Sequence, residues 1–420
     1  MKKLTGFLLL STLTLGLAAC GPGESTGGEK AGKTDKREYD LLVWEDQDKK
    51  IGIEAAVKQF EAEHDVTIKV VEKAYAGQIE DLRLDGPAGT GPDVITIPGD
   101  QIGTAVTEGL LAKLDVSDDV KSIYTESAMQ SQTVDGEVYG LPKAVETQIL
   151  YYNKDIISEE ALPETTDEWL EYSKAIKDKE TFGLLALWDQ IYYAQGVLGG
   201  YGGYVFGQDS EGNYLPEDIG LDNSEAIEGA EYIQQFYKSG VFPTGIIGEQ
   251  GINVLDSLFT EGKAAAVISG PWNLAPYKEA GINYGVKELP ILGNGEPMSS
   301  FIGVKSYNVS SYSKNTELAQ AFVEFIANAE NSAVRYEKTA EVPAVASLSE
   351  DPIIQESESA VAVSKQSQHA VLTPAITAMN AVWEPIDAAL QTIATGKGDP
   401  KTALPQAVEQ IKSSIAATGK

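Results

Sequence analysis

The sequence predicts an α/β protein in which helices cover sheets of mostly parallel strands. Short apolar runs of strand length alternate with stretches whose apolar residues recur at helical spacing. The first series comprises a strand at 39–44, a helix around 53–60, a strand at 66–71, a helix around 79–82 and a strand at 93–97. This order is typical of parallel sheets, because each helix returns the chain to the start of the next strand.

Later segments continue the same pattern. Thr165 and Glu168 have the spacing of a capping box, so a helix is predicted to begin there. The other predicted elements are a helix at 226–237 stopped by Ser239-Gly240, a strand at 264–268, a helix at 318–329 and helices within 375–417 separated at 396–400. The Gly- and Pro-rich stretch 86–92 is expected to be a rigid loop. Its glycines do not open a helix after a strand, which excludes a nucleotide-binding loop.

The N-terminus predicts export. A basic start at Lys2 and Lys3 precedes an apolar run that ends in Leu-Ala-Ala-Cys. The run is interrupted and shorter than the roughly 20 apolar residues of a membrane span, so residues 1–19 are interpreted as a signal peptide. Cys20 is the only cysteine, and its sequence context resembles the bacterial lipobox, which implies a diacylglycerol on its sulfur. An ordinary signal peptide with an incidental Cys20 is the alternative.

The segment 20–38 is polar and Gly-rich, and it is expected to be a flexible tether. Together with a lipid on Cys20, it would hold the folded part at the extracellular face of the cell membrane. Without residues 1–19 the chain has 401 residues, since 420 minus 19 is 401, and this length is enough for two or three domains.

Composition limits the function. The chain has 32 basic and 63 acidic residues, for a formal net charge of −31. Binding to nucleic acid is excluded, because phosphates require a basic surface. With only two histidines, His64 and His369, a zinc site is not expected. We expect no metal and no cofactor.

Aromatic and polar side chains near the ends of predicted strands indicate a sugar site. Trp272 directly follows a predicted strand, while Tyr192 and Trp383 lie in segments interpreted as loops. Acidic and amide side chains follow the first strand at 45–49 and the third at Asp100. Parallel α/β sheets bind ligands beyond these strand ends. For each tryptophan, the alternative is that it fills a core.

A sugar would use both kinds of side chain. Its C–H faces pack on flat rings, and its hydroxyls bond carboxylates, amides and lysines. A neutral hydrogen bond nets about 0.5–1.5 kcal/mol and a charged one about 1.5–3 kcal/mol. Three or four such bonds with two or three stacked rings therefore reach the roughly −8 kcal/mol of a micromolar complex.

Short motifs in a fixed order resemble those of maltose/maltodextrin-binding proteins, the family 1 solute-binding proteins of sugar ABC importers. The similarity runs from about residue 39 to the C-terminus and favours the Gram-positive type. The motifs are Trp44-x3-Asp48-Lys49, Gly91-Pro92-Asp93-Val94-Ile95, Asp100, Gly109-Leu110-Leu111, Ala144-Val145-Glu146, Tyr152-Asn153-Lys154-Asp155, Gly203-Tyr204, Gly270-Pro271-Trp272 and Trp383. The resemblance implies a two-lobed periplasmic-binding-protein-like fold of type II, with sugar in the cleft between the lobes.

The resemblance also implies lobe boundaries and ligand contacts. The N-terminal lobe is expected at 39–147 plus 304–342, and the C-terminal lobe at 148–303 plus 343–420. Crossing segments are expected near 145–148, 302–305 and 342–344. The candidate ligand-binding residues are Asp46, Asp48, Lys49, Asp100, Glu146, Tyr192, Trp272, Trp383 and Glu384.

Several positions depart from the pattern of the best-known family members. Gln101 and Asp387 stand where arginines are familiar, Gln190 where a glutamate is, Glu384 where a tyrosine is, and Ile97 where a tryptophan stacks on sugar. The first lobe is therefore less aromatic, and two cationic partners are missing. These changes leave the preferred sugar length and linkage open.

The expected function is capture of malto-oligosaccharides by a monomeric, lipid-anchored protein that delivers them to the permease subunits of an ABC importer. One alternative is another oligosaccharide, such as a cyclodextrin or a galacto-oligosaccharide. A glycosidase using Glu146 and Asp100 is another, and it would need the two carboxyl groups about 5–10 Å apart. A third is a lipid-anchored adhesin, although the sequence contains no repeats.

Overall fold

A computed structural model describes residues 37–177, 181–209 and 213–418. The predicted signal peptide, Cys20 and all but the last two residues of the predicted tether lie outside the described residues. Within the described ranges, no helix has both the length and the apolar character needed to cross a lipid bilayer.

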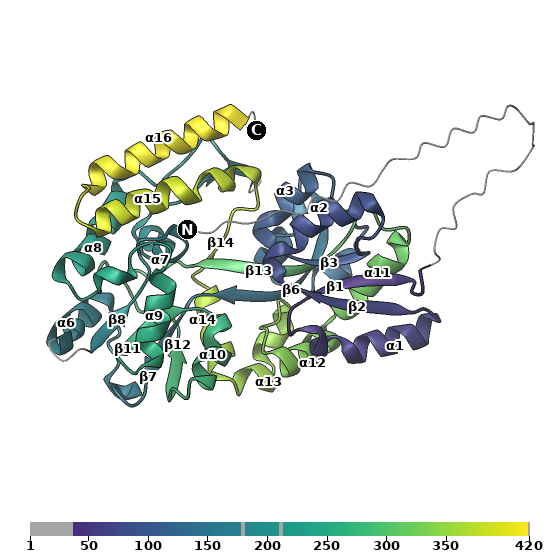
Figure 1. The fold of residues 1–420 in the computed structure, drawn as a ribbon, viewed down its shortest axis with the longest axis horizontal. Coiled ribbons are helices and arrows are strands. Elements are labelled where there is room, and N and C mark those ends of the chain that lie inside the picture. The colour runs from purple at the N-terminus through teal and green to yellow at the C-terminus, as the bar shows by residue number, and fades with distance from the viewer. Residues whose placement is uncertain (1–36, 178–180, 210–212, 419–420) are drawn as a thin grey trace, which may run out of the picture. The chain divides into compact units, whose positions relative to one another are not determined.

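The first sheet has six strands in the order β14-β13-β3-β1-β2, with β6 also paired to β13 (Figure 1). Its strands are β1 (Leu41–Asp46), β2 (Ile68–Lys73), β3 (Val94–Pro98), β6 (Gly140–Thr147), β13 (Phe301–Val309) and β14 (Val371–Leu372). β1 is parallel to β2 and β3, and β13 is parallel to β14. β13 runs antiparallel to β3 and β6. The centre of the sheet is covered on both sides, since every residue of β1 except the last is buried.

Two separate cores pack on this sheet. One contains Phe60 and Phe322, and the other contains Trp44 and Ile97. The helices of this part are α1 (Glu54–His64), α2 (Gln78–Ala88), α3 (Ile102–Thr107), α4 (Asp118–Lys121), α5 (Glu126–Gln130), α11 (Thr316–Ile326) and α12 (Ala329–Thr339). A hairpin of β4 (Thr133–Val134) and β5 (Glu137–Val138) lies between α5 and β6 in the chain.

The prediction of a loop beginning at Gly86 was wrong. α2 continues through Pro87 and ends at Ala88, where Gly89 caps it with a left-handed φ of 74°. Gly86 is a glycine because of packing: a Cβ at this position would lie 2.4 Å from the ring of Tyr312. The close approach of a distant ring, rather than a turn, requires this glycine.

The second sheet has the order β12-β7-β11-β8. Its strands are β7 (Ile149–Asn153), β8 (Phe182–Leu185), β11 (Ala264–Ser269) and β12 (Tyr284–Lys287), and β9 (Gly207–Gln208) pairs with β10 (Tyr214–Leu215) in a separate hairpin. The helices of this part are α6 (Thr166–Ile176), α7 (Ile191–Tyr201), α8 (Ser224–Ser239), α9 (Gly251–Thr260), α10 (Leu274–Glu279), α13 (Pro352–Gln355), α14 (Glu358–Ser367), α15 (Trp383–Ala394) and α16 (Pro400–Thr418). The capping box at Thr165 is confirmed, and α8 ends at Gly240, with φ of 67°, as predicted.

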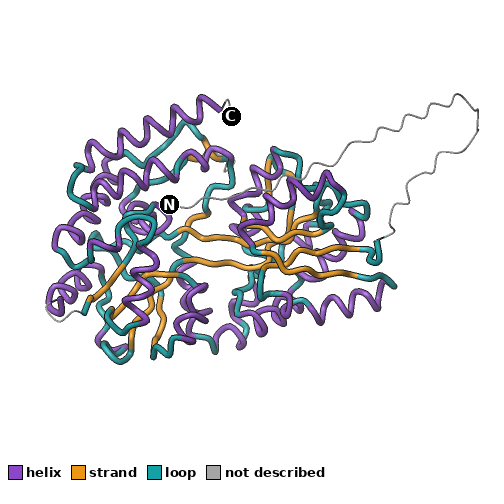
Figure 2. Tube along the Cα trace, viewed as in Figure 1, coloured by secondary structure: helices purple, strands orange, loops and turns teal. Residues whose placement is uncertain are grey.

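Three segments connect the two groups of elements. β6 runs almost directly into β7, and β13 lies beside β6 with Gly303 opposite Glu146. The segment after α12 joins them, because the amide of Val145 donates a 2.8 Å hydrogen bond to the carbonyl of Val342. The long strands that pass between the groups are visible in Figure 2. The three predicted crossing segments are therefore neighbours.

Candidate functional site

A small cavity lies against the crossing strands, where ends of strands from the first sheet face α7 and the start of α15. Its volume is about 100 Å³. Tyr75, Pro98, Gly99, Asp100, Ser131, Glu146, Tyr192, Ile302, Gly303, Val304, Leu372, Thr373 and Trp383 line it. Four of the predicted ligand-binding residues are in this lining: Asp100, Glu146, Tyr192 and Trp383. Larger hollows exist elsewhere, but this one gathers aromatic rings and carboxylates from several elements.

Three predicted aromatic residues form a chain of ring contacts that runs through Phe301. The ring centroid of Tyr192 lies 6.2 Å from that of Trp272 and 6.3 Å from that of Phe301. Phe301 in turn lies 6.2 Å from Trp383. Trp272 is 38% exposed, whereas Trp169 is completely buried. An exposed indole beside a cavity is available for stacking, while Trp169 fills a core.

The interpretation of Tyr192 and Trp383 as loop residues was wrong. Tyr192 and Tyr193 lie in the first turn of α7, and helical spacing sends them in different directions. Tyr193 is almost fully buried in the core of the second sheet, and Tyr192 lines the cavity. Trp383 is likewise the first residue of a helix, α15.

Two carboxylates lie in the cavity wall. Asp100 belongs to η3 (Gly99–Gln101), the turn that follows β3, and Glu146 is near the end of β6. Burial raises the pKa of Asp100, and the charge of Glu146 raises it further. Burial and the same two carboxylates raise the pKa of Tyr192, so its hydroxyl remains a protonated donor at neutral pH. The cavity therefore offers both hydrogen-bond acceptors and a donor.

A lysine that sequence reasoning missed stands behind this wall. The ammonium of Lys305, on β13, lies 3.3 Å from Glu146, 3.5 Å from Glu341 and 4.0 Å from Asp46. It also lies 4.9 Å from the ring centroid of Tyr75. The predicted contact residue Asp46 thus joins the cluster, as do the unpredicted Tyr75 and Glu341. The sequence marked the neighbourhoods of 305 and 341 as crossing segments but gave no signal for these charges.

Below this cluster is a fully buried ion pair. Lys143 lies 2.5 Å from Glu45 and 3.1 Å from Glu341. The hydroxyl of Tyr307 donates to the second oxygen of Glu45 at 2.9 Å. Burial alone would raise the pKa of Glu341, but the charges of Lys143 and Lys305 outweigh it and lower the pKa to about 2. Glu341 is therefore ionised at any ordinary pH.

The remaining predicted contacts do not reach the cavity. Asp48 is exposed, with a left-handed φ of 62°. Lys49 donates to the carbonyl of Thr339 at 3.3 Å. Glu384 is exposed in the first turn of α15. None of the three lines the cavity in the part of the chain that the structure describes. Asp46 and Trp272 are also absent from the lining, and they lie near it through Lys305 and Tyr192.

The departures from the family pattern have structural roles. Ile97 is completely buried in the core that contains Trp44. Asp387 accepts a hydrogen bond from the amide of Ile191, and Gln190 donates to the carbonyl of Gly248 at 3.4 Å. Asp387 thus supports the start of α7 from α15, and Gln190 links the residue before α7 to Gly248.

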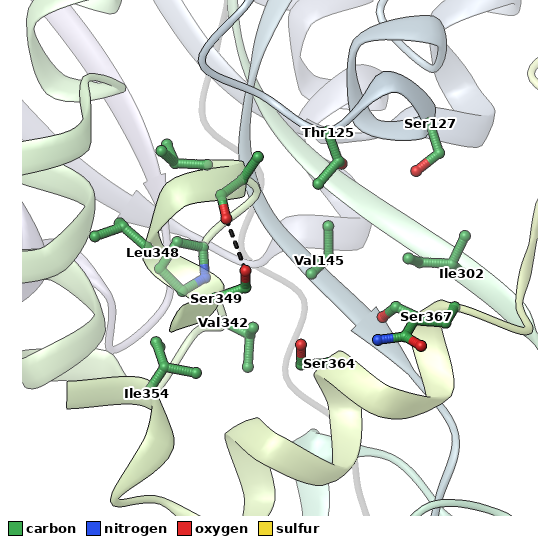
Figure 3. A pocket seen from close by; sticks show the side chains of 14 residues that line it. Thr125, Ser127, Val145, Ile302, Val342, Leu348, Ser349, Ile354, Ser364 and Ser367 are labelled. Carbon is green, nitrogen blue, oxygen red and sulfur yellow. Dashed lines mark hydrogen bonds between the residues drawn. The ribbon is translucent and has the colours of Figure 1, made fainter. Parts of the chain in front are cut away.

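A second cavity lies at the same crossing strands (Figure 3). Its volume is about 290 Å³, and Val145, Ile302 and Val342, one residue from each crossing segment, contribute to its lining. Because successive side chains of a strand point to opposite faces, Val145 faces this second cavity and Glu146 the first. The two cavities therefore lie on opposite faces of β6.

Chemically, the first cavity is suited to a neutral polyhydroxylated ligand. Rings provide stacking surfaces, and carboxylates and a phenol provide hydrogen bonds. Among the described residues, no group of three or more acidic, histidine or cysteine side chains is placed to hold a metal ion.

Comparisons with known proteins agree with this chemistry. A family model described as bacterial extracellular solute-binding protein matches residues 55–362. The chain is 61% identical over 416 residues to the galactooligosaccharide-binding protein of Bacillus subtilis, covering 99% of this chain and 98% of that protein. It is 38% identical over 422 residues to the maltodextrin-binding protein MdxE of the same organism, with the same coverages.

Solved structures give the same picture. A cyclo/maltodextrin-binding protein in complex with maltotetraose superposes with a TM-score of 0.83 at 36% identity, covering 91% of this chain and 98% of that chain. The maltose-binding protein MalE of Listeria monocytogenes, in complex with maltose, also gives a TM-score of 0.83 at 36% identity. Its match covers 90% of this chain and 98% of that chain.

Proposed function

This chain belongs to the bacterial extracellular solute-binding proteins, and on that basis we propose that it captures galacto-oligosaccharides and delivers them to an ABC importer. The observation that carries the sugar assignment is the arrangement of Tyr192, Trp272 and Trp383 beside Asp100 and Glu146. A sugar's faces stack on the rings while its hydroxyls bond the carboxylates.

The choice of galactose-based sugars rests on two supports. The relative named for galacto-oligosaccharides is 61% identical over almost the whole chain, against 38% for the one named for maltodextrins. In addition, the sequence lacks a tryptophan at Ile97 and arginines at Gln101 and Asp387, where familiar maltodextrin binders have them. The cleft therefore lacks one stacking ring and two cationic partners of those binders, which favours a different sugar.

Malto-oligosaccharides, the sugars expected from the sequence motifs, are the second candidate. The solved neighbours in complex with maltotetraose and maltose favour them. Because the fold serves many ligands, similarity of fold decides less here than the side chains of the cleft.

Under this proposal, residues at the cavity contact the central sugar unit and residues away from it contact the outer units. Asp46, Asp100 and Glu146 accept hydroxyl hydrogens, and the three rings stack on sugar faces. Asp48, Lys49 and Glu384 would contact only the outer units of a longer ligand, because they lie away from the cavity.

Ligand entry would require the two lobes to separate. A cavity of about 100 Å³ is well below the roughly 300–1,000 Å³ of ligand pockets. We propose that the lobes, bounded at 39–147 plus 304–342 and at 148–303 plus 343–420, open and close about the three crossing segments. Binding of sugar to both lobes would favour the closed arrangement.

A lipid on Cys20 would anchor a monomer at the extracellular face of the membrane, and permease subunits would receive the sugar there. The protein would act as a binder and not as an enzyme. Incubation with a trisaccharide should therefore release no monosaccharide, and release would contradict the proposal.

Titration calorimetry tests the ligand. Galacto-oligosaccharides and maltodextrins of two, three and four units, and a cyclodextrin, would be titrated into the chain without its signal peptide. Galacto-oligosaccharides should bind most tightly. A preference for maltodextrins would transfer the assignment to the second candidate, and no heat with any sugar would contradict sugar binding altogether.

A further inference from the structure

We propose that Lys305 is a positioning residue of the cleft, which holds the carboxylate of Glu146 and the ring of Tyr75 in place for the sugar. This inference rests on the proposed function. Lys305 is absent from the cavity lining, so its action would pass through these two residues, both of which line the cavity.

The first support is the number of segments that Lys305 connects. Its ammonium pairs with Glu146 on β6, with Glu341 in the segment after α12 and with Asp46 at the end of β1. Lys305 itself lies on β13. One side chain therefore joins all three crossing segments and the first strand of the sheet.

The second support is how the ammonium is shared. Charge-assisted hydrogen bonds between nitrogen and oxygen are about 2.7–2.9 Å long. The three ion-pair distances of Lys305 are 3.3, 3.5 and 4.0 Å, so no single carboxylate holds it closely. One oxygen of Glu341 is buried and has no hydrogen-bond partner among the described residues, and Lys305 is the cation that pairs with it. The lysine thus sits centrally among its partners.

The third support is the balance of charge. Asp46, Asp100, Glu146 and Glu341 surround this end of the cleft. Among the described residues, Lys305 is the sole ion-pair partner of Asp46 and Glu146. The other lysine nearby, Lys143, pairs with Glu45 and Glu341 instead. Without Lys305 these carboxylates would repel one another, and those facing the cavity would move apart or take up protons.

The fourth support is the ring. The ammonium of Lys305 lies 4.9 Å from the centroid of Tyr75, within the range of a cation–π contact. The backbone amide of Tyr75 also donates to Asp46 at 3.1 Å. Lys305 and its partner Asp46 therefore fix both the ring and the backbone of a cavity residue.

The test compares Lys305→Met, Lys305→Arg and Lys154→Met. Lys154 is the matched control, because it too pairs with a carboxylate, Glu358 at 3.6 Å, and lies 5.9 Å from a tyrosine ring. It is outside the lining of the cavity. Affinity for a galacto-trisaccharide would be measured by calorimetry from pH 5 to pH 8, and stability by urea unfolding.

We expect Lys305→Met to weaken binding at least tenfold at pH 7, with partial recovery at pH 5 as the unpaired carboxylates take up protons. Lys305→Arg should restore most of the affinity at neutral pH, and Lys154→Met should bind like the original protein. The inference is overturned if Lys305→Met binds normally, or if it loses affinity equally at every pH and Lys305→Arg gives no rescue. Absence of binding by the original protein would instead remove the proposed function, and this inference with it.

Discussion

Asp387 on α15 accepts a 2.7 Å hydrogen bond from the backbone amide of Ile191, the first residue of α7. The carboxylate therefore supports the helix start that carries Tyr192 into the cleft. Burial raises the pKa of Asp387 to about 6, with a smaller contribution from the charge of Asp189. Asp387, which stands where an arginine is familiar in the family, therefore supports the helix that carries Tyr192.

The raised pKa of Asp387 predicts a pH-dependent effect on stability. The folded state holds the proton more tightly than the unfolded state, where the pKa is about 3.9. The contribution of this group is therefore greatest below about pH 4 and is lost as the pH rises through 6. Asp387→Asn keeps the acceptor and removes the charge. It should be more stable than the original protein at pH 7, by a margin that shrinks toward pH 5, as measured by urea unfolding.

The control for this experiment is Asp387→Ala, which removes the acceptor. It should be less stable than Asp387→Asn at pH 7, by about 1 kcal/mol, the usual cost of losing a helix cap. A constant difference between Asp387→Asn and the original protein from pH 5 to pH 7 would contradict the titration.

A second prediction concerns the exposed indole. Trp272→Ala should weaken sugar binding at least tenfold, which is about 1.4 kcal/mol, because a stacking surface is lost. Trp383→Ala should do the same. Tyr204→Ala is the control, since Tyr204 is 39% exposed, close to the 38% of Trp272, and does not line the first cavity. Unchanged calorimetric affinities for both tryptophan variants would assign these rings to packing alone.

Locally determined features could be predicted from the sequence. The capping box at Thr165 and the helix end at Gly240 depend on residues within a few positions of each other, and the structure has both. β11 was recognisable because residues 264–268 form a continuous apolar run, and the structure buries all of them. Gly86 was misread, since its reason is the ring of Tyr312, which is distant in the sequence.

Residues of the candidate site could be predicted when they belong to a motif of the family. Asp100 and Glu146 follow this rule, and the structure brings them together. Lys305 and Glu341 do not, because a single charged residue in a strand or loop has no pattern that marks its partners. Their contacts arise only when β13 pairs with β6 and the segment after α12 returns beside it.

A third prediction concerns the buried ion pair. Lys143→Met would leave Glu45 buried without a cation, and the expected cost is about 3–5 kcal/mol of unfolding free energy. Lys401→Met removes an exposed pair with Glu231 and should change stability by less than about 1 kcal/mol. Urea unfolding of both variants gives the comparison. Equal effects would mean that the interior around Glu45 is well solvated.

A fourth prediction uses the second cavity, whose lining includes all three crossing segments. The structure contains this cavity of about 290 Å³ together with a narrow sugar cleft. A side chain that fills the second cavity should therefore favour this closed arrangement of the lobes over an open arrangement in which the second cavity is smaller. Ser364→Leu, on α14, should therefore raise sugar affinity without touching the sugar. Small-angle scattering of the unliganded variant should also give a smaller radius of gyration.

Ser413→Leu serves as the control, because Ser413 is exposed on α16 and outside both cavities. It should alter neither affinity nor size. If Ser364→Leu binds sugar more weakly while remaining as stable as the original protein, the cavity must be larger in the open arrangement. Filling the second cavity would then favour the open arrangement of the lobes instead of the closed one. If affinity and size are both unchanged, the second cavity is not coupled to lobe motion at all.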